Sequence, residues 1–295
     1  MLNGAITALV TPMKKQGRVD FASLERLIEF QINNDVVGLV TIGSTGEAMG
    51  LTLAEKIAVV KHVITVVALR VKVIVGVSYA STAEAGQFIE QLNTIAGIDY
   101  IMVVTPYYVK PSQDGLYQHF AYLAKISNQP LILYNVPGRT GCNLADTTTL
   151  KLAQDFSNIV GLKDATGDVT RGCYLIKHKP DGFAVYSGDD ATALAFMLCG
   201  GNGVISVVSN IVPKEFSTLC NLAMSGEPAR AIAINNAIME LHTAMFVESN
   251  PIPVKWSLYR LGIIASPSLR LPLTPLSKAY QESLKPILNK IINGL

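Results

Sequence analysis

The stretch Ile159-Val160-Gly161-Leu162-Lys163-Asp164-Ala165-Thr166 is an apolar run that turns polar at a lysine. Its first four residues do not alternate between apolar and polar side chains, as a strand with one wet face would. Continuous apolarity is typical of a strand that is buried on both faces, as in a parallel sheet. The stretch therefore predicts a buried strand that carries a lysine at its end.

Seven more short apolar runs, rich in β-branched residues, recur along the 295-residue chain. They are Ala5–Val10, Gly38–Ile42, Val71–Val77, Tyr100–Val104, Pro130–Tyr134, Phe183–Tyr186 and Gly203–Val208. Segments with helical spacing separate them, among them Phe21–Asn33, Leu53–Leu69 and Thr82–Ile95. Ser81 is placed to cap the last of these helices. Strand–helix alternation repeated eight times predicts a (β/α)8 TIM barrel.

A doubly wound α/β sheet is the alternative architecture. It often has a glycine-rich phosphate loop after its first strand, whereas Ala5–Val10 is followed by Thr11-Pro12-Met13. We expect residues 1–225 to form the catalytic barrel and residues 226–295 to form a small C-terminal helical domain. Its helices are expected at Glu227–Phe246, Pro253–Leu261 and Ser277–Ile292.

The composition argues against several classes of function. Charged residues make up 16% of the chain and the net charge is +2, without a long basic run, which argues against a nucleic-acid partner. No apolar stretch is long enough to span a bilayer, so no membrane partner is expected. The N-terminus does not have the charge order of a signal peptide, and the four cysteines are widely spread. These features predict a cytoplasmic protein.

Lys163 is the strongest candidate for chemistry. Burial disfavours an ammonium group and pushes a lysine toward its neutral, nucleophilic amine, which attacks carbonyl compounds to form a Schiff base. The alternative is a lysine that extends to solvent where its strand ends. In a barrel of this kind, the active site lies at the C-terminal ends of the strands.

Other polar residues are expected at the same end of the barrel. The sequences that follow the predicted strands include Gly43-Ser44-Thr45-Gly46-Glu47, Thr105-Pro106-Tyr107-Tyr108, Tyr134-Asn135-Val136-Pro137-Gly138-Arg139-Thr140, Ser187-Gly188-Asp189-Asp190 and Ile205-Ser206. Each alone has a structural interpretation, as a turn, a helix cap or a rim aromatic. Together they suit a carbonyl substrate with a carboxylate, because hydroxyls transfer protons, arginine binds carboxylates, and turn amides bind anions.

Metal-dependent aldol chemistry is the competing enzyme class. It would need histidine or acidic ligands at the strand ends. All four histidines (His62, His119, His178 and His242) fall in predicted helices, so no metal or other cofactor is expected. A non-catalytic binding barrel is the remaining alternative. It would keep the carboxylate-binding groups but has no need of a buried lysine beside a tyrosine.

The chain resembles the dihydrodipicolinate synthase family. The resemblance runs from Gly4–Pro12 to Phe246–Lys255, and therefore covers essentially the whole chain. Its more specific motifs are Tyr134–Thr140, Lys163–Asp168 and Asn250–Pro253. The wider superfamily of pyruvate aldolases includes N-acetylneuraminate lyase and 2-keto-3-deoxygluconate aldolase, which share the glycine-rich turn, the tyrosine and the lysine. Ser44 stands where this synthase usually has threonine, and serine also occurs there in the sialate-lyase branch.

The resemblance implies a lyase of the diaminopimelate and lysine biosynthetic route. Pyruvate would form a Schiff base with Lys163, and its enamine would attack L-aspartate 4-semialdehyde. The implied proton relay is Ser44, Tyr134 and Tyr108. Thr45 would bind the pyruvate carboxylate and Arg139 that of the semialdehyde, while Gly188 and Ile205 would contact substrate through their backbones. The family also implies a homotetramer, a dimer of dimers, with Tyr108 shared across the tight dimer.

The resemblance also bears on regulation by L-lysine. In lysine-regulated relatives the effector occupies a cleft at the dimer interface, which matches Ala48, Leu53, Lys56, Ala80, Glu84 and Tyr107 here. Glu84 and Tyr107 agree with the regulated pattern, but a serine, two histidines and an asparagine have been lost at the other positions. Lys56 adds a cation that could pair with Glu84. We therefore expect the protein to be insensitive to lysine.

Overall fold

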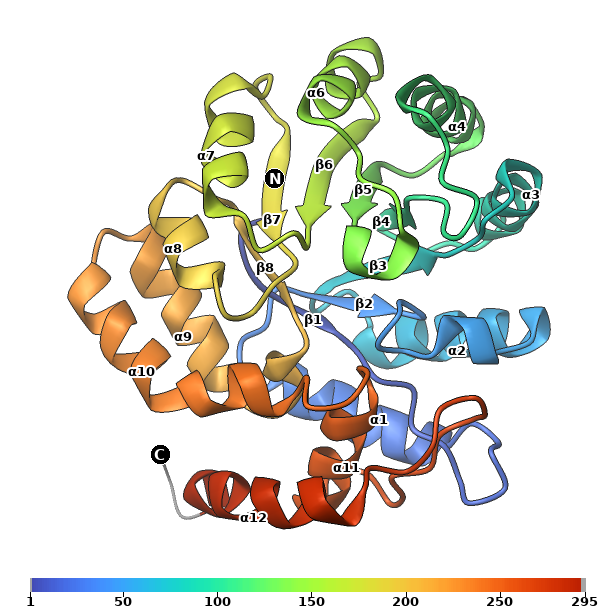
Figure 1. The fold of residues 1–295 in the computed structure, drawn as a ribbon. Coiled ribbons are helices and arrows are strands. Elements are labelled where there is room, and N and C mark those ends of the chain that lie inside the picture. Colours follow the sequence, from blue (N-terminus) through green and yellow to red (C-terminus); the bar gives the residue numbers. More distant parts are fainter. Residues whose placement is uncertain (1, 293–295) are drawn as a thin grey trace.

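The computed structural model describes residues 2–292, and they contain a closed barrel of eight parallel strands in the order β1 to β8 (Figure 1). The barrel closes where β1 pairs with β8, at Gly4 with Gly203 and at Ile6 with Ile205. The strands are β1 (Gly4–Ala8), β2 (Gly38–Thr41), β3 (Lys72–Val77), β4 (Tyr100–Val104), β5 (Leu131–Asn135), β6 (Ile159–Asp164), β7 (Ala184–Ser187) and β8 (Gly203–Ser206). The predicted TIM barrel is confirmed, and the doubly wound sheet is excluded.

Helices follow the strands and surround the barrel (Figure 1). Those of the barrel are α1 (Phe21–Ile32), α2 (Leu53–Val67), α3 (Thr82–Leu92), α4 (Gln113–Ile126), α5 (Pro137–Thr140), α6 (Asp146–Asp155), α7 (Val169–His178), α8 (Ala193–Leu198) and α9 (Pro213–Met224). Two short 3-10 helices, η1 (Ala48–Gly50) and η2 (Val208–Asn210), follow β2 and β8. The chain ends in α10 (Pro228–Ala244), α11 (Ile252–Arg260) and α12 (Lys278–Ile292).

The ends of these elements have local causes. The Ser81 side chain accepts a hydrogen bond from the amide of Glu84, so the predicted cap of α3 is confirmed. Helix α2 was predicted to reach Leu69 but ends at Val67. Ala68 and Leu69 both have left-handed backbone conformations, with φ of 47° and 64°, which an α-helix does not accommodate.

Apolar side chains pack in two layers, one inside the barrel and one between the barrel and its helices. The inner layer includes Ile6, Val40, Ile74, Met102 and Ile132, one from each of the first five strands. These side chains fill the barrel, as the continuous apolarity of the strands predicts. The interior of the barrel is therefore a packed core.

The last three helices lie along one side of the barrel, where α10 packs against both α9 and α12 (Figure 1). Their predicted bounds agree with the observed ones to within two residues. The division into a barrel of residues 1–225 and a domain of residues 226–295 stays a prediction. Among the described helices, none combines the length and the hydropathy that a bilayer span requires.

Candidate active site

A cavity of about 130 Å³ lies at the C-terminal ends of the strands and contains most of the predicted site residues. Ser44, Thr45, Tyr134, Arg139, Lys163 and Gly188 all line it. Because these residues lie at the ends of strands β2, β5, β6 and β7 or just after them, the closed barrel brings them together. The cavity also has apolar walls, which include Ala8, Val40, Met102 and Val136.

Lys163 stands next to Asp164, the last residue of β6, and is buried, with 5% of its surface exposed. Burial lowers the pKa of its amine to about 8, while the charge of Asp190 opposes this shift and the charge of Arg139 adds to it. Its Nζ lies 4.3 Å from the centre of the Tyr134 ring. At neutral pH a pKa near 8 leaves roughly a tenth of the lysine in the nucleophilic form.

Gly188 explains how the lysine side chain fits between strands β6 and β7. A Cβ atom at this position would lie 2.9 Å from Lys163 Cε and 2.8 Å from the Cβ of Ala165. Both distances are too short for a contact between two carbon atoms. A glycine at position 188 therefore leaves the room that the lysine side chain needs. The residue at the end of β7 therefore shapes the site by having no side chain.

Tyr134 is the second buried titratable group of the cavity. Burial raises the pKa of its phenol to about 12, whereas the charge of Arg139 and a hydrogen bond with the Ser44 side chain lower it. The phenol thus stays protonated at neutral pH and is able to donate a proton. Its hydrogen bond with Ser44 gives a short path for proton transfer.

The turn of residues 43–47 faces the lysine from the end of β2. Among the described residues, the backbone amides of Ser44 and Thr45 form no hydrogen bond within the protein. Amides left free in such a turn are suited to bind an anion. The Thr45 hydroxyl accepts a hydrogen bond of 2.9 Å from Nδ2 of Asn250, so a residue that precedes α11 also reaches the site.

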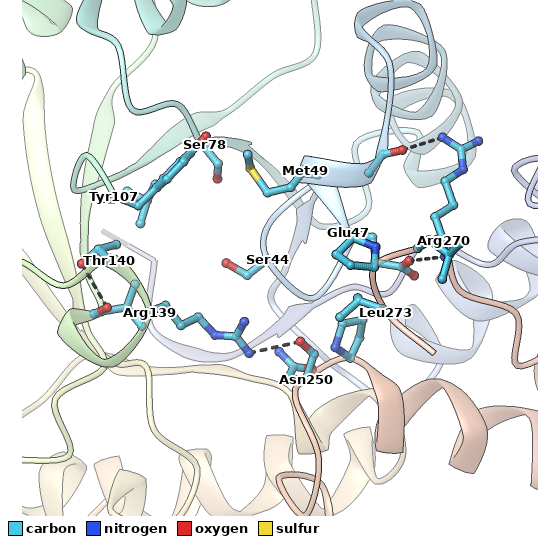
Figure 2. A pocket seen from close by; sticks show the side chains of 17 residues that line it. Ser44, Glu47, Met49, Ser78, Tyr107, Arg139, Thr140, Asn250, Arg270 and Leu273 are labelled. Carbon is cyan, nitrogen blue, oxygen red and sulfur yellow. Dashed lines mark hydrogen bonds between the residues drawn. The ribbon is translucent and has the colours of Figure 1, made fainter. Parts of the chain in front are cut away.

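A second cavity of about 350 Å³ adjoins the first one, and Figure 2 shows its lining. The two share Ser44, Val136, Arg139 and Asn250. Arg139 lies between them and donates a hydrogen bond of 3.1 Å from Nη2 to the carbonyl oxygen of Asn250 (Figure 2). The larger cavity is the outer one, because it is lined by exposed residues such as Met49 and Leu271.

Two predicted site residues do not line either cavity. Ile205 is buried in β8, and its side chain belongs to the barrel interior. Tyr108 is exposed over 89% of its surface and lies outside both cavity linings. A single chain therefore does not test whether Tyr108 takes part in catalysis.

Sequence reasoning assigned no role to Asn250 or Asp190, although both stand in stretches that it singled out. Asn250 stands in a motif that was recognised, Asn250–Pro253, but nothing in the sequence indicates that the chain returns to the barrel there. Asp190 is buried, and its Oδ2 accepts hydrogen bonds of 3.0 Å from the amides of Val207 and Val208. Burial raises the pKa of this carboxyl group. Its neighbour Asp189 lines the inner cavity instead.

No metal centre is found among the described residues, since no group of three or more histidine, cysteine or acidic side chains could hold an ion. All four histidines lie on helices, His62 on α2, His119 on α4, His178 on α7 and His242 on α10.

A TIM barrel whose end holds a buried, partly neutral lysine beside a protonated tyrosine is typical of enzymes that form a Schiff base with a carbonyl substrate. Comparison with known proteins gives the particular group. Residues 1–291 match the model of the dihydrodipicolinate synthetase family, and the chain belongs to this family. The predicted resemblance is confirmed, and the protein is a lyase that acts by aldol-type condensation through a Schiff base.

The relatives match over nearly their full length. The 4-hydroxy-tetrahydrodipicolinate synthase of Laribacter hongkongensis is 47% identical over 285 residues, which cover 97% of each chain. The chloride-inhibited dihydrodipicolinate synthase of Acinetobacter baumannii, solved with pyruvate, is 47% identical, with a TM-score of 0.95 and 98% of each chain covered. A Cyanidioschyzon merolae enzyme solved with lysine bound is 36% identical, with a TM-score of 0.93 and coverage of 100% and 99%.

The pKa of Lys163 leads to a first prediction. Acylation by a small reagent such as acetic anhydride requires the neutral amine, so labelling of Lys163 should rise with pH around a midpoint near 8. Exposed lysines in the same sample should show a midpoint near 10.4, their ordinary value. Quantitative peptide mass spectrometry between pH 6 and 11 measures both. A midpoint above about 10 for Lys163 would contradict the assigned effect of burial.

Proposed function

We propose that the protein condenses pyruvate with L-aspartate 4-semialdehyde to give 4-hydroxy-tetrahydrodipicolinate, in the route to diaminopimelate and lysine. The observation that supports this most is the position of Lys163. Its partly neutral amine reaches a small cavity of about 130 Å³, which opens past Arg139 into a larger one of about 350 Å³. This pair of cavities suits a small keto acid in the inner space and a second, acidic substrate in the outer one.

The first half of the proposed reaction attaches pyruvate to the enzyme. The neutral amine of Lys163 attacks the keto carbon, and the resulting carbinolamine loses water to give an imine. The free amides of the turn and the Thr45 hydroxyl bind the pyruvate carboxylate. Tyr134, close above the lysine, supplies the proton with which the hydroxyl leaves as water. The backbone of Gly188 completes the pocket. A backbone contact of Ile205 with the substrate stays a prediction.

The second half forms the carbon–carbon bond. Loss of a methyl proton converts the imine into an enamine, whose carbon attacks the aldehyde carbon of the semialdehyde. The relay of Ser44, Tyr134 and Tyr108 moves the protons, and Arg139 binds the carboxylate of the semialdehyde. The amino group of the bound adduct then attacks the imine carbon. Ring closure releases Lys163 as the free amine, so the enzyme is restored.

Arg139 carries a prediction about substrate choice. Arg139→Ala should lower the efficiency with aspartate semialdehyde by roughly ten- to a hundredfold, the scale of one charge-assisted contact. It should affect formation of the pyruvate imine far less, through the rise in the pKa of Lys163 that follows the loss of the Arg139 charge. A coupled assay measures turnover and borohydride trapping measures the imine. Arg230→Ala, which removes an exposed arginine paired with Glu227, is the matched control and should match the wild type in both.

Equal losses in both half-reactions would show that Arg139 has a structural role instead. The same assay includes N-acetylneuraminate and 2-keto-3-deoxygluconate as competing substrates, because Ser44 also occurs in the sialate-lyase branch. Turnover of either one in preference to aspartate semialdehyde would assign the protein to a related aldolase.

We further infer that the working protein is a cytoplasmic homotetramer, a dimer of dimers, in which Tyr108 enters the site of a partner subunit. Tyr108 is held with a left-handed backbone, at φ 72°, by a hydrogen bond of 3.0 Å from its amide to the Thr140 carbonyl. Such a conformation is costly for a bulky residue, by about 1–3 kcal/mol. Exposed Met49, Val109 and Leu271 add apolar surface that a second copy would cover.

Mixing variants tests the sharing of Tyr108. Tyr108→Phe and Lys163→Ala homo-oligomers should each be nearly inactive. After subunit exchange, one of the two sites in a mixed dimer has both the hydroxyl and the amine, so each mixed dimer should have about half of the wild-type activity. A random mixture, in which about half of the dimers are mixed, should recover about a quarter. Native mass spectrometry verifies the exchange. Absence of recovery in verified mixed dimers would mean that Tyr108 does not act across the interface.

Insensitivity to L-lysine remains part of the proposal. Lys56 is buried, and its Nζ donates a hydrogen bond of 3.1 Å to the Tyr79 hydroxyl, whose ring centre lies 4.5 Å away. It forms no ion pair with Glu84 within the described residues, so the expected direct pairing is absent, although the carboxylate raises the pKa of Lys56 against the larger effect of burial. A cation therefore already stands near Glu84, where the ammonium of a bound lysine would lie.

Titration of the coupled assay with L-lysine tests this. We expect less than half inhibition at about 10 mM, because the loss of two or three polar contacts weakens binding by several powers of ten. Lys56→His should increase sensitivity, whereas Lys61→His, one turn further along α2 and exposed, should not. Saturable inhibition of the wild type in the sub-millimolar range would contradict the assignment.

A further inference from the structure

The segment that leads into α11 touches the glycine-rich turn of residues 43–47 at two points. Asn250 donates from Nδ2 to the Thr45 hydroxyl at 2.9 Å. Lys255, on the first turn of α11, donates from Nζ to Glu47 Oε1 at 2.5 Å. The turn is thus held near its middle and at its end by residues from the C-terminal part of the chain.

The ion pair between Lys255 and Glu47 is almost completely shielded from water, with side chains 0% and 2% exposed. Lys255 also donates to the carbonyl oxygen of Ser268 at 2.7 Å. The other oxygen of Glu47 accepts a hydrogen bond of 3.2 Å from the amide of Arg270 (Figure 2). Both charged groups therefore have hydrogen-bond partners in fixed directions. Neither group takes a direct part in the chemistry of Lys163.

A buried ion pair is a poor source of stability, because the cost of removing two charges from water offsets much of their attraction. It does impose geometry, because both groups lose their partners if either one moves. The turn of residues 43–47 needs such a constraint on its shape. Glu47 has a left-handed backbone, at φ 54°. Among the described residues, one backbone hydrogen bond lies within the turn, from the Glu47 amide to the Ser44 carbonyl oxygen, and the Ala48 amide just after it donates to that of Gly43.

We propose that Lys255 and Asn250 are positioning residues, which hold the residues 43–47 turn in the shape that binds the carboxylate of the keto acid. The inference rests on the proposed function, in which this turn binds pyruvate. It means that the affinity for the first substrate depends on residues outside the barrel. The ion pair contributes to binding through the turn, and neither of its members touches the reacting atoms.

The charge-neutral variant Glu47→Gln/Lys255→Met tests the role without leaving one buried charge alone. The pyruvate concentration that gives half-maximal borohydride trapping should rise by about tenfold or more, the scale of one lost charge-assisted contact. The trapping rate at saturating pyruvate should stay within about threefold, since the lysine itself is unchanged. Glu282→Gln/Lys285→Met, which removes an exposed ion pair on α12, is the matched control and should leave both values unchanged.

Asn250→Ala gives an independent test that strands no charge, and it decides the matter if the double variant does not fold. It should raise the half-saturating pyruvate concentration severalfold, also without a large change in the maximal rate. An unchanged half-saturating concentration in a folded double variant, or in Asn250→Ala, would overturn the proposal. A wild-type protein that traps no pyruvate at all would instead refute the proposed function, so the two failures are distinguishable.

Discussion

The burial of one amino group is the constraint on which the rest of the structure depends. Lys163 ends a strand of the barrel where water is largely excluded, and this lowers its pKa from that of an ordinary lysine to about 8. The neighbours of Lys163 are compatible with a buried, partly neutral amine. Gly188 leaves room for its side chain, and Tyr134 covers it with a ring instead of an anion. The charge of Asp190 opposes this shift.

The barrel supplies what this lysine alone lacks. Its strand ends bring a turn with free amides, a protonated phenol and a guanidinium group around one small cavity, and the outer cavity gives a second substrate access to it. The C-terminal helices then fix the turn through Asn250 and Lys255. The site is thus built by two parts of the chain, the barrel that carries the reactive groups and the segment around α11 that sets the geometry of one of them.

Sequence reasoning succeeded where periodicity and position along a strand decide the outcome. The eight apolar runs predicted the strands. The polar residues near their ends were expected at one end of the barrel, and Lys163, Tyr134, Arg139, Ser44 and Thr45 do line one cavity there, while their roles stay predictions. It failed where two distant segments meet. The contacts of Asn250 and Lys255 with the turn join residues about 200 positions apart, and no local pattern encodes them. The contact predicted for Tyr108 is with a second chain, so neither a local sequence pattern nor the fold of one chain contains it.

Covalent trapping is the measurement that tests the central claim most directly. The protein is treated with pyruvate and sodium borohydride, digested, and mapped by mass spectrometry. The account predicts a single reduced pyruvate adduct, located on the peptide that contains Lys163 and absent from Lys163→Ala, whose fold should survive because no buried partner is left unpaired. An adduct on a different lysine, or no adduct in folded wild-type protein, would contradict the claim that this buried amine is the nucleophile.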